Sequence, residues 1–543
     1  MALAAFAAVL VFVVLFWRLG EPTFWDPDEA HYAETTREMV ATGDWMAPHY
    51  NEQPFFDKPA LFHQLQGAAM LVFGPTEFAA RLVPALAALV LAATTVWFGA
   101  TMLSAETGVL AGLLLIACPG VFGLARYAIL DTVFTAFVFG GAALTTVAAL
   151  RGRPRLQYPG YVLIALGVLT KGPLAVVLCG LPFLLAISVS ADLRRRLLGL
   201  RWGIGLAIVV ALAAPWFIYM YLRFLQDFVN GYVLDENLRL FAGSRFANQP
   251  GFSFYFQILA VGLMPWTGLL VGRFVDDVRA TVRGERLDGL ETLLWAWTIA
   301  IVAFFTLSTF KLDHYVFPAA PALYLLCART WSDVRADQFS PRHAVSRLGL
   351  LLVGPLLVVI GVACGYFLTV RLRLPQAAAI VPVALTLAGV VVTAAVNVRR
   401  TLSRLPWIVV SAMLVVYASV VLFVGPALEE HKVVDDLADW VVHHAQAGDR
   451  IASYKLNRWN PSFRFYVGRH TTFLEDPEEA AAFLGSGQPF YCVMQRAAYD
   501  EFVARGVELE ILDEREGMWA TSGRTLWRQR APLARFVIVT RSQ

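Results

Sequence analysis

The chain has 543 residues, of which 58% are hydrophobic and only 16% are charged. Soluble domains usually carry about 25% charged residues, and the apolar residues here form repeated long runs. The composition therefore excludes an ordinary soluble protein and predicts an α-helical polytopic membrane protein. The net charge of +3 is small, so the placement of the charges is more informative than their sum. The five cysteines have no paired spacing, which argues against a disulfide framework or a cysteine-based metal site.

The first apolar run extends from Met1 to Trp17, and no small-residue cleavage site follows it. We therefore expect a retained membrane span rather than a signal peptide. A span needs roughly 20 apolar residues. The two apolar runs around Lys171 are short or interrupted by proline, and they could form one kinked span. Counted separately, they bring the expected spans to thirteen, near residues 1–18, 78–100, 104–124, 129–150, 158–170, 172–190, 202–222, 253–272, 289–308, 314–328, 348–370, 376–396 and 406–426.

The arginines distinguish between these two topologies. If the N-terminus is cytoplasmic and the chain crosses thirteen times, every cytoplasmic loop is short and basic, as the positive-inside rule requires. Merging the two runs at Lys171 would place the later clusters outside, so thirteen spans are favoured and the C-terminus lies on the outer side. The clusters are Arg151, Arg153, Arg155; Arg194, Arg195, Arg196, Arg201; Arg273, Arg279, Arg283, Arg286; Arg329, Arg335, Arg342, Arg347; and Arg399, Arg400, Arg404.

Three long segments lie on the outer side of the predicted membrane domain, which covers residues 1–428. They are residues 20–77, residues 223–251 and the tail, 429–543. The tail alternates helical stretches with short strand-like runs, a pattern that predicts a small soluble α/β domain. Its expected helices are Lys432–Gln446 and Pro477–Leu484, and its expected strands are Arg450–Tyr454, Phe490–Met494 and Val507–Leu512.

The first outer segment begins with the acidic stretch "FWDPDEAHYAE". Asp26 is a good N-cap, Pro27 suits the first helical position, and Glu29 completes a capping box. The helix is expected to run to about Ala41 and to stop at Gly43. Capping does not require Asp28, which shares one helix face with His31 and Tyr32. Asp28 therefore either supports the helix dipole or serves catalysis.

Other ionisable residues lie at the predicted outer ends of spans. Lys58 follows two phenylalanines in "NEQPFFDKPAL", where it is either an interfacial anchor or a cation for a phosphate. Asp131 and Lys171 lie in "RYAILDT" and "VLTKGP". All of these groups share one side and one depth, and ionisable groups there are usually functional. The motif "STFKLDHYVFP" adds Lys311, Asp313, His314 and Tyr315.

The acidic stretch also contains potential metal ligands. Asp26, Asp28 and Glu29, with His31 and His49 nearby, offer oxygen and nitrogen donors for a divalent cation. The helix cap explains the same acids without a metal, and it is the favoured interpretation. We therefore expect no required cofactor, with a divalent metal as the alternative.

Taken in order, "DPDEAHYAE", "GDWMAPHYNEQPFFDKPAL" and "FAARLVPAL" resemble the first outer loop of bacterial GT-C glycosyltransferases. The nearest pattern is that of the lipid A 4-amino-4-deoxy-L-arabinose transferases, within the protein-mannosyltransferase-like group. "RYAILDT", "GVLTKGP" and "KLDHYVFP" match later motifs in the same order, so the resemblance covers about residues 20–330. It implies an inverting transfer of a sugar from a polyprenyl (usually undecaprenyl) phosphate, on the periplasmic face of the bacterial inner membrane.

The resemblance also implies roles for individual residues. Asp28 takes the position of the first-loop catalytic aspartate, and Asp131 that of a second important aspartate. Lys58 and Tyr315 take positions near the donor phosphate, where His31 and Lys171 are expected to assist. The expected partners are the donor, a lipid or glycan acceptor and membrane lipids, and no nucleic acid. Further residues expected around the site are Glu29, Tyr32, Asp57, Lys311 and His314.

The sequence departs from the arabinose transferase pattern at three places. His31 stands where that family commonly has Arg, Asp57 where it has Glu, and Asp313-His314 where it has Pro-Thr. These departures leave the sugar and the acceptor (lipid A, another glycolipid or a protein) open. Two further alternatives remain: a flippase or transporter for the lipid-linked sugar, although the polar groups gather on one outer face rather than at the bilayer midplane, and a non-catalytic envelope assembly factor.

Overall fold

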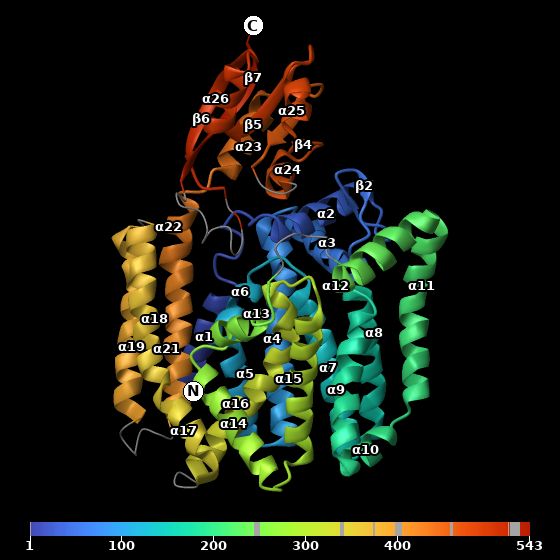
Figure 1. The fold of residues 1–543 in the computed structure, drawn as a ribbon, viewed down its shortest axis with the longest axis vertical. Helices are drawn as coiled ribbons and strands as arrows, with labels where there is room; N and C mark the ends of the chain where they lie inside the picture. Colours follow the sequence, from blue (N-terminus) through green and yellow to red (C-terminus); the bar gives the residue numbers. More distant parts are fainter. Residues whose placement is uncertain are drawn as a thin grey trace.

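The structure is a computed structural model that describes residues 2–243, 250–336, 341–372, 375–396, 404–456, 460–519, 521 and 533–542. A large body of helices carries a small domain with a β-sheet on one end (Figure 1). Two arginines of the last predicted cytoplasmic loop, Arg399 and Arg400, lie outside the described residues.

Helices occupy the positions of all thirteen predicted spans. By length and composition, seven helices of the described residues can cross a membrane, or nine if each of two bent pairs is one span. The chain is thus an integral membrane protein. The helices of the body are α1 (Ala2–Leu15), α4 (Glu77–Met102), α5 (Ala105–Ile116), α6 (Pro119–Ala125), α7 (Asp131–Leu150), α8 (Gln157–Lys171), α9 (Leu174–Val189), α10 (Ala191–Leu198), α11 (Trp202–Phe228), α13 (Phe254–Gly262), α14 (Thr267–Val282), α15 (Gly289–Leu307), α16 (Ala320–Ala336), α17 (Ala344–Leu351), α18 (Val353–Tyr366), α19 (Ile380–Val396), α21 (Leu405–Ser419) and α22 (Gly425–Glu429).

The predicted spans 104–124 and 253–272 are wrong as single helices, and α5 and α6 meet at a bend of 64°. The chain bends by 120° between α13 and α14, and α14 continues to Val282. Pro265 lies in the break, where its missing N–H prevents a continuous helix.

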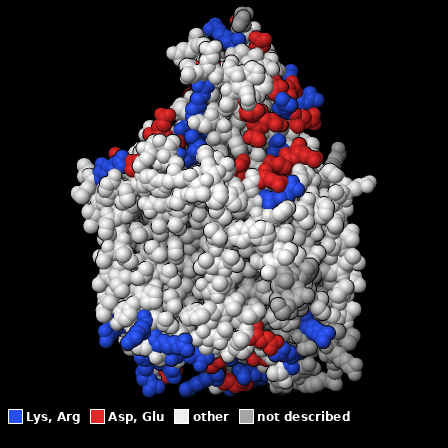
Figure 2. Space-filling model, turned by 180° about the vertical axis from the view of Figure 1, so that it is seen from behind, with Lys and Arg blue, Asp and Glu red and all other residues white. Residues whose placement is uncertain are grey.

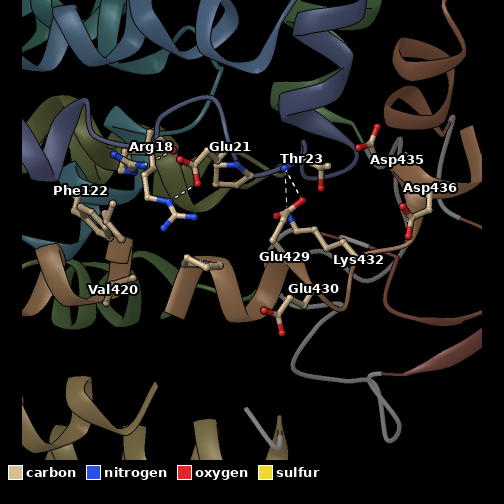
Figure 3. Close-up of a pocket in the computed structure, with 15 residues that line it drawn as sticks. Arg18, Glu21, Thr23, Phe122, Val420, Glu429, Glu430, Lys432, Asp435 and Asp436 are labelled. Carbon is tan, nitrogen blue, oxygen red and sulfur yellow. Dashed lines mark hydrogen bonds and ion pairs between the residues drawn. The ribbon is translucent and has the colours of Figure 1, made fainter. Parts of the chain in front are cut away.

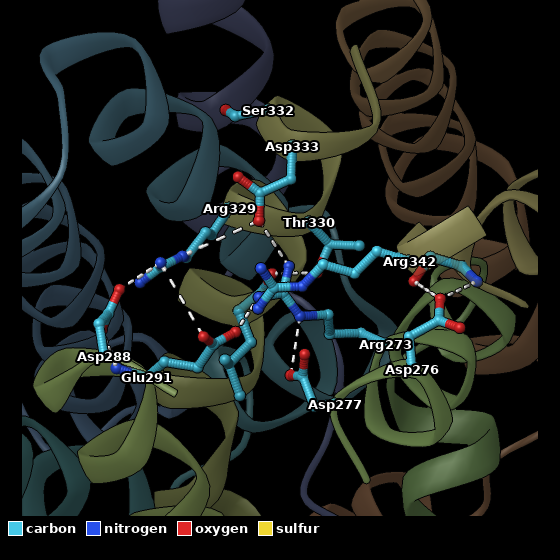
Figure 4. A network of polar contacts seen from close by, with 12 residues as sticks. Arg273, Asp276, Asp277, Asp288, Glu291, Arg329, Thr330, Ser332, Asp333 and Arg342 are labelled. Atoms are coloured by element: carbon cyan, nitrogen blue, oxygen red, sulfur yellow. Dashed lines mark hydrogen bonds and ion pairs between the residues drawn. The ribbon is translucent and has the colours of Figure 1, made fainter. Parts of the chain in front are cut away.

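A buried network of charged side chains holds α14 against α15 and α16 (Figure 4). The Arg273 guanidinium, 2% exposed, lies 2.8 Å from Asp277 and 2.6 Å from Asp333, and it also pairs with Glu291. Burying an arginine is unfavourable unless its charge is paired. Arg273, which the sequence analysis assigned to a cytoplasmic loop, therefore lies inside the helical body and joins α14 to α15 and α16.

The first outer segment is largely helical. It contains α2 (Asp28–Thr42), a short hairpin of β1 (His49–Tyr50) and β2 (Gln53–Pro54), and α3 (Leu61–Phe73). The predicted stop at Gly43 is confirmed, because this residue has a left-handed φ of 70°. The second outer segment continues α11 as the π-helix η2 (Val229–Arg239) and then α12 (Leu240–Ala242).

The C-terminal domain has a five-stranded sheet in the order β4-β3-β5-β7-β6. Strand β3 (Arg450–Tyr454) pairs in parallel with β4 (Thr472–Leu474) and β5 (Phe490–Gln495), whereas β7 (Ala534–Arg541) pairs antiparallel with β5 and β6 (Leu509–Gly517). The predicted helices and strands are present, with β6 longer than expected. The helices around the sheet are α23 (Val434–His444), α24 (Pro461–Val467), α25 (Pro477–Leu484) and α26 (Arg496–Ala504).

The capping box predicted for α2 is wrong. The Asp26 carboxylate instead accepts hydrogen bonds from the backbone N and the hydroxyl of Ser462, at 2.9 and 2.6 Å, and from the Trp519 indole at 2.8 Å. Glu29 accepts from the Arg81 guanidinium at 2.6 and 2.9 Å and from the Ala128 amide at 3.0 Å. Both carboxylates are completely buried. They join the start of α2 to the C-terminal domain and to the helical body, and Glu29 also accepts a hydrogen bond from the Trp25 amide at 3.0 Å.

Helix α24 lies directly on α2 (Figure 1). The buried Arg464 guanidinium of α24 lies 3.0 Å from Glu34 and 2.6 Å from Glu38, both on α2. The C-terminal domain therefore helps to fix the orientation of the helix that begins with Asp28.

We expect Arg464→Met to destabilise the protein by about 3–5 kcal/mol, because it leaves the buried Glu34 and Glu38 carboxylates without this partner. Thermal unfolding in detergent should show a lower Tm. The matched control is Arg535→Met, which removes an arginine with a 64% exposed side chain from the same domain. Equal Tm values for the two variants would contradict the structural role of Arg464.

Candidate active site

A cavity of about 300 Å³ lies where the outer segments meet the helical body. One part of its wall is polar and comes from the first outer segment, from the break between α8 and α9, and from η2. The rest is apolar and comes mainly from α9, α12 and α15. The lining residues are Asp57, Lys58, Lys171, Pro173, Leu174, Val177, Tyr232, Glu236, Asn237, Leu238, Leu240, Phe241, Phe304, Phe305, Ser308, Phe310 and Tyr315. Such a cavity suits a molecule with an anionic head and a long apolar chain.

Lys58 reaches this cavity from the segment before α3. Its ammonium group donates a hydrogen bond to the Asp57 carbonyl oxygen at 2.8 Å and lies 3.3 Å from a carboxylate oxygen of Glu236. Glu236 belongs to η2, far away in the sequence, and sequence reasoning missed it. The acidic pair in "VLDENLRL" was the available signal, but nothing local connected it with Lys58.

Lys171 enters the cavity at the end of α8. Gly172 follows with a φ of 79°, and a Cβ at this position would lie 2.1 Å from the Tyr232 hydroxyl, so only glycine fits there. The Lys171 ammonium lies 2.5 Å from the Asp131 carboxylate and 4.5 Å above the Tyr315 ring. A buried carboxylate and an aromatic face thus hold the lysine at the cavity wall.

Asp131 contacts two basic side chains, Lys171 and His314. It begins α7, is 3% exposed, and has His314 Nε2 at 3.6 Å in addition to Lys171. The other ring nitrogen of His314 lies 3.1 Å from the Asp313 carboxylate. Asp131 therefore orders two basic groups around the cavity.

Asp28 is half-buried at the start of α2, beside Tyr32 one helical turn later. Burial raises the pKa of Tyr32, and the nearby charges of Asp131, Asp57 and Asp28 raise it further. The charges of three carboxylates singled out in the sequence therefore act on the Tyr32 hydroxyl. Tyr32 stays protonated and can donate a hydrogen bond.

Seven of the predicted site residues are not among those that line the cavity: Asp28, Glu29, His31, Tyr32, Asp131, Lys311 and His314. His31 packs edge-on against Tyr50 and Phe55, with ring centroids 4.2 and 5.1 Å away. Lys311 donates a hydrogen bond to the Ser308 carbonyl oxygen. Burial and the neighbouring His31 and Lys58 lower the pKa of His63 to about 3, so this buried imidazole stays neutral beside them.

The potential metal ligands are dispersed among other partners. Asp26 binds groups of the C-terminal domain and Glu29 binds Arg81. Within the described ranges, no group of three or more His, Cys, Asp and Glu side chains is placed to hold a metal ion.

The fold is similar to that of a solved membrane protein. A solved structure, ArnT from Cupriavidus metallidurans bound to undecaprenyl phosphate, matches with a TM-score of 0.75 at 22% identity, over 99% of this chain and 97% of that chain. The family profile of the dolichyl-phosphate-mannose-protein mannosyltransferases matches residues 5–229. Both matches support the resemblance that the first-loop motifs indicated.

Two curated relatives are named undecaprenyl phosphate-alpha-4-amino-4-deoxy-L-arabinose arabinosyl transferase. The one from Aeromonas salmonicida is 32% identical over 338 residues, which is 60% of each chain. The one from Aeromonas hydrophila is 32% identical over 344 residues, 62% of this chain and 61% of the relative. The chain thus aligns with about three-fifths of the length of these relatives. The resemblance to lipid A arabinose transferases is confirmed.

Proposed function

We propose that the protein is an inverting glycosyltransferase that moves a sugar from a polyprenyl phosphate donor to a cell-envelope acceptor such as lipid A. The observation that carries this proposal is the cavity, where the ammonium groups of Lys58 and Lys171 lie beside an apolar wall. A lipid phosphate needs both features in one place. The name of the curated relatives supports undecaprenyl as the lipid.

In this proposal the donor phosphate replaces Glu236 as the anionic partner of the Lys58 ammonium. Glu236 is the anion that Lys58 pairs with at 3.3 Å, so a bound phosphate takes over an electrostatic role that the fold already provides. The prenyl chain lies along the apolar wall, which includes Val177, Phe304 and Phe305. Lys171 stays beside Asp131 and stabilises the charge that develops on the departing phosphate.

Asp28 acts as the general base in the proposed mechanism. It removes the proton from the acceptor hydroxyl while the acceptor oxygen forms a bond to the anomeric carbon. At the same time the bond between the anomeric carbon and the phosphate oxygen breaks. The leaving group is the polyprenyl phosphate. One displacement inverts the anomeric configuration, so a single carboxylate suffices. No metal ion is assigned to the reaction, and we expect turnover to be unchanged by EDTA.

The proposed topology has thirteen spans, a cytoplasmic N-terminus and a periplasmic active site in the bacterial inner membrane. Support comes from the basic side chains, which gather at the end of the helical body opposite the C-terminal domain (Figure 2). By the positive-inside rule this end faces the cytoplasm. Domain boundaries at 1–428 and 429–543 remain our proposal, with the second domain bound to α2.

Deletion of the gene tests the function. Mass spectrometry of lipid A, other envelope glycolipids and glycoproteins should show the loss of one sugar mass from one class of acceptor, which identifies both sugar and acceptor. Unchanged masses in all three classes would contradict the proposal. Purified protein in detergent micelles should also make the product, which separates it from a flippase, because a micelle has no two sides between which a lipid can be moved.

A further inference from the structure

A second and larger cavity, of about 560 Å³, lies beside the start of the first outer segment (Figure 3). It shares no lining residue with the cavity at Lys58. Its wall comes from three parts of the fold: the segment after α1, the outer ends of the α6 and α21–α22 regions, and the start of the C-terminal domain. The cavity is thus at the junction between the membrane body and the outer domain.

One end of this cavity carries two arginines, one carboxylate and an apolar ring, and Arg18 forms an ion pair with Glu21 there. Arg18 and Phe122 lie there together (Figure 3). The neighbouring Arg126 guanidinium donates hydrogen bonds to the carbonyl oxygens of Val14, Trp17 and Arg18 at 3.2, 3.0 and 3.2 Å. Among the described residues it forms no ion pair, so its charge is held in place without being neutralised by a carboxylate.

The other end is acidic. Asp435 and Asp436 of α23 line the cavity from the C-terminal domain, and Glu430 lines it beside Glu429 (Figure 3). No ion pair within the described parts of the chain involves these three carboxylates. Burial raises the pKa of Asp435, and its acidic neighbours raise it further. A cation at this end would relieve the repulsion between the carboxylates.

A buried hydroxyl between the two ends also lacks a partner. Thr23 is 7% exposed, lines the cavity, and its Oγ1 has no hydrogen-bond partner among the described residues. Its backbone groups are engaged, because the Thr23 amide donates to Glu429 and the Thr23 carbonyl oxygen accepts from Lys432, both at 2.8 Å. The Thr23 Oγ1 atom is fully buried, so Thr23 closes the wall between the two ends of the cavity and does not offer its hydroxyl to an occupant.

From this arrangement we propose that the cavity binds the headgroup of a zwitterionic phospholipid that carries a phosphate followed by an amine. The phosphate lies at the arginine end, beside Arg126, and the ammonium group at the Asp435–Asp436 end. The order fits the position of the cavity, because the phosphate of such a lipid lies closer to the acyl chains than its amine does. The acyl chains leave over Phe122, Val420 and Val421, which form the apolar part of the wall.

The consequence is a lipid-dependent joint between the two domains. The arginine end belongs to the membrane body and the acidic end to the C-terminal domain, which also orients α2 through Arg464. A lipid that bridges the two ends therefore stabilises their docking. This inference does not depend on the proposed glycosyl transfer.

Delipidated full-length protein in detergent provides the test. Phosphatidylethanolamine should raise Tm and bind at least tenfold more tightly than phosphatidylglycerol, which has the phosphate without the amine. Water-soluble glycerophosphoethanolamine should bind at least tenfold more weakly than the lipid, because it lacks acyl chains. Equal affinity for the two phospholipids, or for the lipid and its soluble headgroup, would overturn the proposal.

Two variants locate the site. Asp435→Asn/Asp436→Asn should abolish the preference for phosphatidylethanolamine over phosphatidylglycerol, and Arg126→Gln should weaken the binding of both lipids. Asp435 and Asp436 are exposed, so their replacement leaves the fold intact. The matched control is Asp439→Asn on the same helix, which lies outside the cavity and is 69% exposed. A preference that survives the double substitution would place the lipid elsewhere and refute the assignment.

Discussion

Asp28→Asn should lower turnover by about 10²–10⁴-fold, the usual contribution of a general base. The amide has nearly the shape of the carboxylate but cannot take the acceptor proton. The start of α2 should stay in place, because Asp26 and Glu29 hold it through Ser462 and Arg81. Single-turnover measurements with purified protein and excess acceptor isolate the chemical step, and Tm with and without the donor lipid reports donor binding.

The matched control for this variant is Glu52→Gln. Glu52 is an acid of the same outer segment whose side chain is 68% exposed and does not line the cavity. The Glu52→Gln variant should retain full turnover, and both variants should bind the donor like the unchanged protein. Near-normal turnover of Asp28→Asn would show that another group accepts the proton. Loss of donor binding together with turnover would assign Asp28 to the binding site instead.

Lys58→Ala and Glu236→Gln should change donor affinity in opposite directions. Removal of the lysine loses a charge-assisted contact with the phosphate, worth about 1.5–3 kcal/mol, or roughly 10–100-fold in affinity. Removal of the Glu236 charge takes away the anion that lies 3.3 Å from the Lys58 ammonium, so the phosphate no longer has to displace it. Equilibrium binding of the polyprenyl phosphate to the two purified variants measures both effects.

A matched control for this pair is Lys455→Ala, which removes a lysine of the C-terminal domain away from the cavity. Its donor affinity should be unchanged. If Glu236→Gln weakened binding as Lys58→Ala does, Glu236 would be a structural support for the lysine rather than a competitor of the phosphate. Unchanged affinity in Lys58→Ala would remove the lysine from the donor site.

The positions of the helices in the membrane body could be predicted from the sequence, because hydropathy is a local property of each run. The same runs and the arginine pattern predicted which helix ends face outward and which ionisable residues lie at those ends. The bend between α13 and α14 has a local signal in Pro265, but a count of apolar residues does not detect it, because the apolar run continues through the bend. Its stabilisation depends on Arg273 meeting Asp333, which is 60 residues away.

The first outer loop shows the same division more clearly. The sequence by itself determined that the helix beginning in "DPDEAHYAE" ends at Gly43. It also predicted that Asp28, Lys58, Asp131 and Lys171 lie at the same end of the membrane body. Only the tertiary structure decided their partners. Asp26 binds Ser462, which is 436 residues later, instead of capping the helix. Lys58 binds Glu236, which is 178 residues later. Helix ends and spans depend on neighbours in the chain, whereas the pairing of buried charges depends on which segments the whole fold brings together.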